Sequence, residues 1–202
     1  MPLWLAERPL VLASKSEIRR AVLTDAAIPV EVSPADVDER GIEQAATTRD
    51  AGEIAARLAR AKAQAIAARL PDRLVLGADQ TLALAGLRFS KPADRAAARD
   101  QLKMLRGQTH ELHTAIALAR EGSIVFEHRE VARLTMRAFS DGFLESYLDA
   151  MGSAVTASVG GYQLEKAGSQ LFERIDGDHF VILGLPLMAL LAYLRRAGCL
   201  AE

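Results

Sequence analysis

The sequence holds 202 residues, of which 50% are hydrophobic and 25% charged, which is enough for one globular domain with a sizeable core. Twenty-five lysines and arginines oppose 26 acidic residues, so the net charge of -1 offers no basic field to a nucleic-acid backbone. No apolar run approaches the ~18 residues of a membrane span, and the lone Cys199 favours a reducing, cytoplasmic setting. We therefore expect a single domain over residues 1–202 that partners neither nucleic acid nor membrane.

The first third of the chain predicts strands that alternate with helices. Residues 10–13 form a short apolar strand, and apolar side chains then recur at helical spacing until Pro29 breaks the pattern. Residues 30–32 predict a second strand. The polar, acidic stretch from Ser33 to about Asp50 is expected to be a loop whose length indicates function. Asp50 and Glu53 then form a plausible capping pair for a helix that ends before Pro71.

The remaining two thirds predict more strands, including an antiparallel pair. A buried-type strand over residues 74–78 ends at Asp79. The further expected elements are a hairpin over 81–89 turning near Gly86, a helix over 93–105, strands over 109–119 and 124–138, a helix from Ser140, a turn at 160–161, a short strand over 171–175, a loop over 176–178, and a helix from Pro186 to Gly198. This order favours an α/β fold with a mixed central sheet flanked by helices, whose ligands bind beyond strand ends.

The segment Ser14–Arg20 is the first candidate for chemistry, because a strand stops there and a helix begins with hydroxyls and cations. The unpaired N–H groups and partial positive charge of a helix N-terminus can hold phosphate. The alternative is that Ser16 is only an N-cap and that the arginines are only solvated.

Asp79 is the second candidate, because its position after an apolar strand lets its side chain project into a strand-end crevice. The alternative is a turn or capping aspartate. Lys62, Lys91 and Glu39, taken one at a time, are typical of surface residues.

The ordered set of motifs resembles the Maf family. The resemblance rests on Leu12-Ala13-Ser14-Lys15-Ser16 with Arg19, Val37-Asp38-Glu39, Ala61-Lys62-Ala63, Gly77-Ala78-Asp79, Lys91-Pro92, Gly107-Gln108-Thr109-His110 and Gly184-Leu185-Pro186-Leu187. It covers essentially the whole chain, and the ordered combination is far more specific than any one motif.

The resemblance implies an elongated α/β fold with a central cleft, and metal-dependent cleavage of a nucleoside triphosphate to the monophosphate and pyrophosphate. Family members are often dimeric, which allows a homodimer here. By the same resemblance, Asp79 matches the catalytic acidic group, while the positions lining the phosphate and metal site are Ser14, Arg19, Glu39, Lys62 and Lys91. Because carboxylates beside a triphosphate would repel it, we expect Asp79 and Glu39 to share Mg²⁺ or Mn²⁺. Whether Asp79 is base, metal ligand or both stays open.

A finer resemblance points to the 7-methyl-GTP pyrophosphatase branch of the family. Gln80 and Glu165 match that branch's base-selecting positions. Ile18, however, stands where the branch has a tryptophan, and an aromatic face would favour a cationic methylated guanine by about 0.5 to 2 kcal/mol. The implied role is removal of 7-methyl-GTP or another modified purine nucleotide, a house-cleaning function.

Two other functions remain as alternatives. The family is also associated with inhibition of septum formation, so a non-catalytic nucleotide-binding regulator of cell division is one of them. A nucleic-acid-binding domain is disfavoured by the charge balance and by only 5% aromatic residues. His110 and His113 are not expected to chelate one metal, because an offset of three sends strand side chains to opposite faces.

Overall fold

A computed structural model describes residues 2–202 and places their strands in one seven-stranded sheet of order β2-β1-β3-β5-β6-β7, with β4 paired to β3. The chain divides into two compact units. Unit 1 holds the residues up to Gln80, Thr114–Glu130 and Asp178–Glu202, and unit 2 holds Thr81–His113 and Val131–Gly177. Strands β3, β5 and β6 contribute residues to both. No helix among residues 2–202 is both long and apolar enough to cross a membrane.

Three strands begin the sheet of unit 1. β1 (Leu10–Leu12) pairs in parallel with β2 (Val30–Val32) and with β3 (Val75–Leu84). All three residues of β1 are fully buried, as expected of a strand covered on both faces. Leu10 and Leu12 pack into one apolar cluster and Val11 into another, because successive side chains point to opposite faces.

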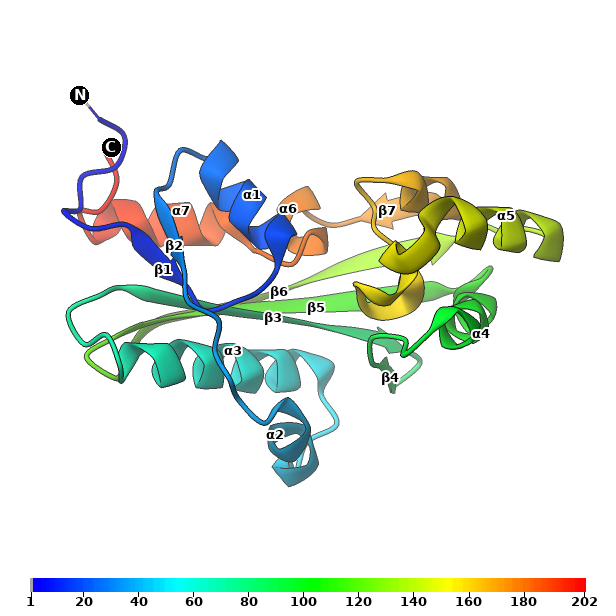
Figure 1. Ribbon diagram of the computed structural model, residues 1–202, viewed down its shortest axis with the longest axis horizontal. Helices are drawn as coiled ribbons and strands as arrows, with labels where there is room; N and C mark the ends of the chain where they lie inside the picture. The colour runs from blue at the N-terminus through cyan, green and yellow to red at the C-terminus, as the bar shows by residue number, and fades with distance from the viewer. Residues whose placement is uncertain (1) are drawn as a thin grey trace. The chain divides into compact units, whose positions relative to one another are not determined.

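Helices cover both faces of this part of the sheet (Figure 1). α3 (Ala51–Ala67) contributes small side chains such as Ala55, Ala59 and Ala63 to one cluster. α1 (Glu17–Asp25) and α7 (Leu187–Arg196) contribute to the other, on the opposite face. The predicted N-cap Ser16 and the predicted glycine after the last helix, Gly198 at φ +69°, are both confirmed.

One helix lies in a stretch predicted as loop, and a second, short helix was not predicted. α2 (Glu39–Ala45) lies inside residues 33–50, capped by Asp38, whose carboxylate accepts from the Gly41 amide. It buries none of its residues, so it carries no apolar periodicity that the sequence could show. α6 (His179–Ile182) follows the predicted loop 176–178 and is only 4 residues long, too short for a periodic signal.

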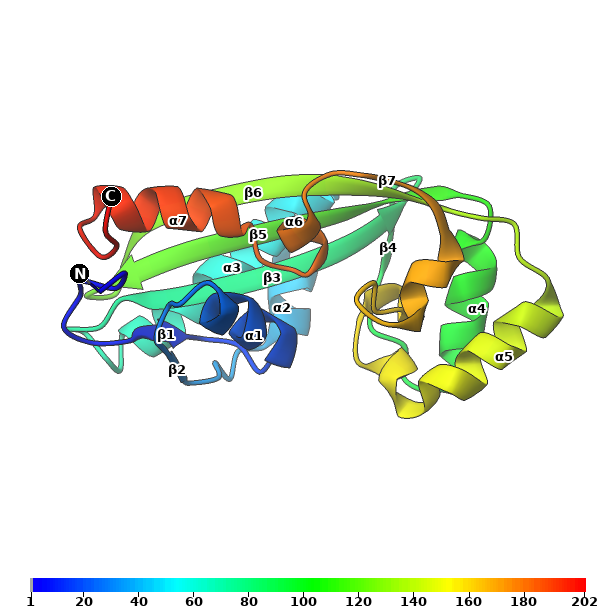
Figure 2. The same ribbon diagram turned by 90° about the horizontal axis from the view of Figure 1, so that it is seen from above.

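Unit 2 packs short helices against the other portions of the strands. Its elements are β4 (Leu87–Phe89), α4 (Arg95–Leu105), β5 (Thr109–Arg120), β6 (Ser123–Met136), α5 (Asp141–Met151), the 3-10 turns η1 (Gly152–Thr156), η2 (Val159–Gly161) and η3 (Ala167–Leu171), and β7 (Phe172–Asp176). α4 and α5 lie side by side (Figure 2), and Glu145 joins them by accepting from Arg95 and Arg99. His110 and Tyr162 form a buried hydrogen bond in this unit.

Parallel pairs at β1 and antiparallel pairs at β3–β4 and β6–β7 make the sheet mixed. The predicted α/β fold with a mixed central sheet flanked by helices is therefore confirmed. The prediction of a single functional domain over the whole chain stays a prediction.

Candidate active site

The turn between β1 and α1 is built by two serine hydroxyls. Ser16 Oγ accepts from the Arg19 amide and caps α1, as predicted. Ser14 Oγ accepts from the Ser16 amide and from Arg19 Nη1, at 3.2 Å each. These bonds fix both the start of α1 and the guanidinium of Arg19.

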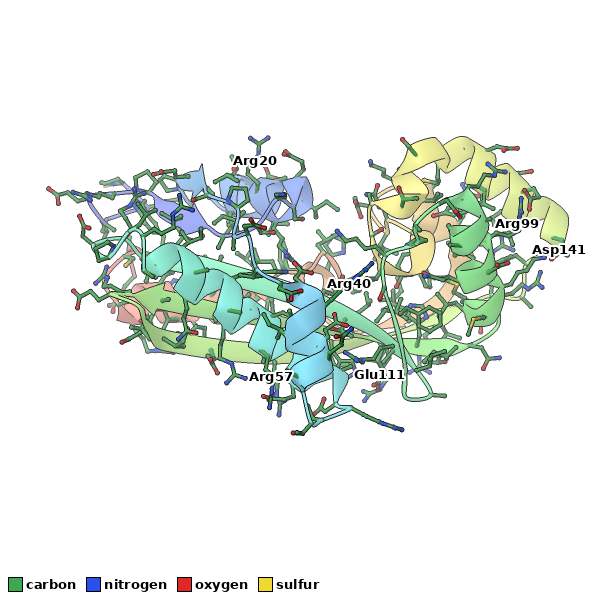
Figure 3. All side chains as sticks on the ribbon, turned by 60° about the horizontal axis from the view of Figure 1, so that its bottom comes forward. Arg20, Arg40, Arg57, Arg99, Glu111 and Asp141 are labelled. Atoms are coloured by element: carbon green, nitrogen blue, oxygen red, sulfur yellow. The ribbon has the colours of Figure 1, made fainter. Side chains whose placement is uncertain are left out.

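The Arg19 guanidinium turns back toward the sheet and binds backbone oxygens. Nη1 donates to the Ala78 carbonyl and Nε to the Gly184 carbonyl, both at 2.8 Å. The next residue, Arg20, lies on the exposed side of α1 and pairs with Glu17 (Figure 3). Of the two adjacent arginines, only Arg19 is therefore part of the buried cluster.

Gly77 allows α3 to lie directly against β3. A Cβ at residue 77 would lie 2.1 Å from the Ala59 carbonyl oxygen and 2.7 Å from the Ala63 amide nitrogen, so any larger residue would push the helix away. Asp79 follows two residues later on the same face of the strand, and Lys62 precedes Ala63 on the helix. The close approach at Gly77 thus brings Lys62 and Asp79 together.

Lys62 joins two carboxylates from different elements. Its Nζ lies 2.6 Å from Asp79 Oδ1 and 2.8 Å from Oε1 of Glu39, the first residue of α2. The side chains of Lys62 and Asp79 are 11% and 12% exposed, whereas that of Glu39 is 52% exposed. The cluster therefore has a buried ion pair and one carboxylate open to solvent.

Burial perturbs the pKa of two ionisable groups of the site. It raises the pKa of Asp79 above its ordinary value, although Lys62 and Arg19 oppose the shift by stabilising the carboxylate. Burial also lowers the pKa of Arg19, against the charges of Asp79 and Glu39, but a guanidinium stays protonated at neutral pH. A carboxyl with a raised pKa beside fixed cations is typical of functional sites.

The two carboxylates fit a cation that a substrate helps to hold. Glu39 and Asp79 converge on one point, where Lys62 Nζ contacts both. Among residues 2–202, no group of three or more histidine, cysteine, aspartate or glutamate residues gathers as a closed metal site would require. Mg²⁺ is usually bound by one or two carboxylates together with substrate phosphates and water. This donor set suits that mode.

Asp79 does not end its strand, contrary to the prediction from the apolar run. β3 continues to Leu84, because Leu82, Ala83 and Leu84 pair with β4. The neighbouring β1, however, ends at Leu12, which is level with Leu76 of β3. Asp79 therefore lies beyond the carboxyl end of the neighbouring parallel strand β1. Its side chain can still face a strand-end crevice, because β1 ends there and not because β3 does.

The side-chain amide of Gln80 is hydrogen-bonded to other groups of the protein. The two hydrogens of its Nε2 are shared among three acceptors: Thr114 Oγ1 at 2.9 Å, the Val181 carbonyl at 3.0 Å and the Ile182 carbonyl at 3.1 Å. The base-selecting role predicted for this residue stays a prediction.

The other predicted residues lie outside this buried cluster or belong to unit 2. Ile18 is half-buried and packs against the apolar cluster of unit 1, so it has a structural role as well. Lys91 and Glu165 are exposed residues of unit 2, on the segment after β4 and on a turn before η3. Their roles as phosphate-binding and base-selecting residues stay predictions.

Two residues of the site were missed by sequence reasoning, although both belong to quoted motifs. Gly77 sets the approach of α3 to β3, and Gly184 accepts from Arg19. The signal available was the glycine itself, since an isolated glycine in a strand indicates a close backbone approach.

Comparisons with known proteins agree with this organisation. The family model described as Maf-like protein matches residues 9–197. A nucleoside triphosphate pyrophosphatase of Rhodopseudomonas palustris (strain BisB18) is 56% identical over 201 residues, covering 100% of both chains. A 7-methyl-GTP pyrophosphatase of Brucella abortus biovar 1 is 46% identical over 196 residues, covering 95% of this chain and 97% of that protein.

Among solved structures, a HAM1 protein from Coxiella burnetii resembles this chain with a TM-score of 0.51 at 15% identity. The match covers 93% of this chain and 98% of that chain. At this identity the likeness concerns the fold alone.

Proposed function

Because the chain belongs to the Maf family, we infer that it is a nucleoside triphosphate pyrophosphatase, a hydrolase that yields the monophosphate and pyrophosphate. The observation that carries this inference is the buried Asp79 carboxylate, held by Lys62 and lying beside the Arg19 guanidinium. A buried carboxylate between two fixed cations can both handle a proton and tolerate a polyanion nearby.

In this mechanism Asp79 accepts the proton of the attacking water. The water oxygen bonds to the α-phosphorus, the bond from that phosphorus to the bridging oxygen breaks, and pyrophosphate leaves with the electron pair. The raised pKa of Asp79 makes its carboxylate a stronger base than an exposed aspartate. Its hydrogen bond to Lys62 fixes the direction of the accepting oxygen atoms.

Cationic side chains stabilise the charge on the departing pyrophosphate. Arg19 and Lys62 do so in this proposal, and Lys91 is added by its match to the family motif. Ser14 holds the Arg19 guanidinium through its hydroxyl. A divalent cation held by Asp79 and Glu39, Mg²⁺ or Mn²⁺, would supply further positive charge to the phosphates.

For the finer substrate we propose 7-methyl-GTP or another modified purine nucleotide, removed in a house-cleaning role. The support is the match of Glu165 to the 7-methyl-GTP branch and the name of the Brucella relative. Glu165 can accept from the N1 and N2 hydrogens of guanine, and its charge favours a cationic ring. Because Ile18 lacks the aromatic face that this branch has at the same position, the preference for 7-methyl-GTP over GTP should be small.

The test is a panel of canonical and methylated nucleoside triphosphates incubated with the purified protein and Mg²⁺ or Mn²⁺. We expect equal amounts of monophosphate and pyrophosphate, with a purine preferred over UTP or dTTP. Diphosphate with orthophosphate would contradict the assignment. Nucleotide binding without any product would instead favour a non-catalytic regulator.

A further inference from the structure

The segment Asp178–Gly184, here called the α6 turn, begins with a capping aspartate. Asp178 Oδ1 accepts from the amides of Phe180 and Val181, at 2.8 and 3.1 Å. The helix that follows has only 4 residues and cannot hold its shape alone. Contacts from other elements must therefore fix this segment.

Two side chains of the sheet supply those contacts. Gln80 Nε2 donates to the carbonyls of Val181 and Ile182, and Thr114 Oγ1 donates to the Val181 carbonyl at 2.9 Å. Thr114 is 1% exposed and also accepts from Gln80. These bonds satisfy carbonyls at the end of α6 and tie the α6 turn to β3 and β5.

The α6 turn ends at Gly184, whose carbonyl accepts from Arg19 Nε. Gly184 has φ +87°, a conformation that other residues rarely adopt. A Cβ there would lie 3.2 Å from both Nε and Nη2 of Arg19. Glycine is thus needed both for the backbone conformation and for the close approach of the guanidinium.

Arg19 connects the α6 turn to the candidate active site. Its Nη1 donates to the carbonyl of Ala78, the residue before Asp79. The guanidinium is therefore held between the α6 turn and the strand that bears the proposed catalytic carboxylate. All of these residues belong to unit 1.

We propose that Gly184, Gln80 and Thr114 are positioning residues, which act on the reaction by holding the Arg19 guanidinium beside Asp79. The proposal rests on the proposed function and assigns Gln80 a task other than reading the base. A small misplacement of a charge-stabilising group is enough to lower the rate by one to two orders of magnitude.

The first experiment compares Gly184→Ala with Gly198→Ala. Both glycines have positive φ, but a Cβ at Gly198 meets nothing within 4 Å, so the control carries the backbone strain without the contact to Arg19. We expect Gly184→Ala to lower kcat/KM at least about tenfold more than the control does. Equal losses in the two variants would overturn the proposal.

The second experiment repeats Gly184→Ala in an Arg19→Lys background, since a lysine cannot bridge the Ala78 and Gly184 carbonyls as arginine does. If Gly184 acts through Arg19, adding Gly184→Ala to Arg19→Lys should lower kcat/KM by less than about threefold further. An undiminished loss would mean that Gly184 acts through the general stability of the protein, and the proposal would fail.

Thr114 and Gln80 provide variants that keep the backbone unchanged. Thr114→Ser retains the hydroxyl donor and should keep most of kcat/KM, whereas the isosteric Thr114→Val should lose about tenfold or more. Gln80→Glu cannot donate to the two carbonyls, so kcat/KM should fall by one similar factor for GTP, 7-methyl-GTP and UTP. A changed preference among these nucleotides, or no fall at all, would overturn the positioning role.

Pyrophosphate binding, measured by titration calorimetry on the same variants, separates this proposal from the proposed function. If the wild-type protein cleaves no nucleotide, the proposed function fails. The positioning proposal then survives only if Gly184→Ala and Thr114→Val weaken pyrophosphate binding while Gly198→Ala and Thr114→Ser do not.

Discussion

Lys62 Nζ on α3 lies 2.6 Å from Asp79 Oδ1 on β3, and both side chains are almost completely buried. A buried ion pair contributes little net stability compared with apolar residues, but removing one partner leaves an uncompensated charge. The pair therefore makes a prediction about stability that is independent of catalysis.

Lys62→Met should lower the free energy of unfolding by about 3 kcal/mol, because it leaves the buried Asp79 carboxylate without its hydrogen-bonded cation. Lys103→Met is the matched control, since Lys103 is 41% exposed and 3.9 Å from Asp141. It should cost less than about 1 kcal/mol. Urea unfolding measures both. Adding Asp79→Asn to Lys62→Met should recover much of the loss, and a purely additive double variant would contradict the pairing.

Asp79→Asn should lower turnover by at least about two orders of magnitude while the protein stays folded, because an amide neither accepts the proton nor holds a cation well. Asp72→Asn is the control, since Asp72 is exposed and pairs with Arg8 at the surface. Initial rates and circular dichroism spectra check both variants. Near-normal turnover of well-folded Asp79→Asn would remove Asp79 from the mechanism.

Gly77→Ala should lower both stability and turnover, because its methyl group would collide with the backbone of α3 at Ala59 and Ala63. Overpacking of this kind typically costs about 1 to 3 kcal/mol. Ala substitution at Gly142 is a suitable control, since a Cβ there meets only Ser140 Oγ at 3.9 Å. Equal thermal melting temperatures and rates for the two variants would show that α3 does not depend on Gly77.

His110 should make the protein sensitive to mild acid. It is fully buried, its Nε2 lies 2.7 Å from Tyr162 Oη, and burial lowers the pKa of His110 to about 4. The unfolded chain takes up a proton near pH 6.5, whereas the folded protein does so only near pH 4. The free energy of unfolding should therefore fall as the pH drops from about 6.5 to about 4, by about 3 kcal/mol from this residue, with no effect above that window.

Denaturant unfolding at several pH values tests this prediction. His110→Asn should flatten the slope between pH 6.5 and 4, although it also lowers stability at pH 8 by disturbing the contact with Tyr162. His128→Asn is the control at an exposed site, because the side chain of His128 is 36% exposed. A steep slope that persists in His110→Asn would assign the acid sensitivity to other groups.

Base choice should respond to Ile18 and Glu165. Ile18→Trp would add an aromatic face, so the ratio of kcat/KM for 7-methyl-GTP to that for GTP should rise, by up to about tenfold. Glu165→Gln should lower that ratio, because the amide loses the charge that favours a cationic ring. The comparison uses one metal throughout. A wild-type preference for dTTP or UTP, together with no effect of Glu165→Gln, would refute the 7-methyl-GTP proposal but leave the pyrophosphatase proposal intact.

Much of the fold followed from local sequence patterns. The strand predicted over residues 10–13 forms at 10–12, and the strand at 30–32 and the glycine after the last helix are present as predicted. The Ser16 N-cap, which was considered as an alternative to a phosphate site, is also present. Each of these features depends on hydrophobic pattern or on local capping chemistry. The helix at Glu39–Ala45 was wrongly predicted as loop, since a helix without buried residues leaves no apolar period to detect.

Within unit 1, the family motifs predicted which residues form the site, but they did not predict which atoms contact one another. Lys62, Asp79 and Glu39 do meet, but they come from three different elements, and the close contact of α3 with β3 requires glycine at residue 77. The three acceptors of the Gln80 amide could not be predicted from the sequence either, because two of them are backbone carbonyls about 100 residues away in the chain. Such long-range contacts depend on packing rather than on local pattern.

The most direct test of the central claim is hydrolysis of a nucleoside triphosphate in water enriched with oxygen-18. Attack at the α-phosphorus predicts one heavy oxygen in each monophosphate and none in the pyrophosphate. With Asp79 accepting the proton, Asp79→Asn should form the labelled monophosphate at least about 100-fold more slowly than the wild type. Mass spectrometry of the two products gives the answer. Label in the pyrophosphate, or labelled monophosphate at the wild-type rate from Asp79→Asn, would contradict the account.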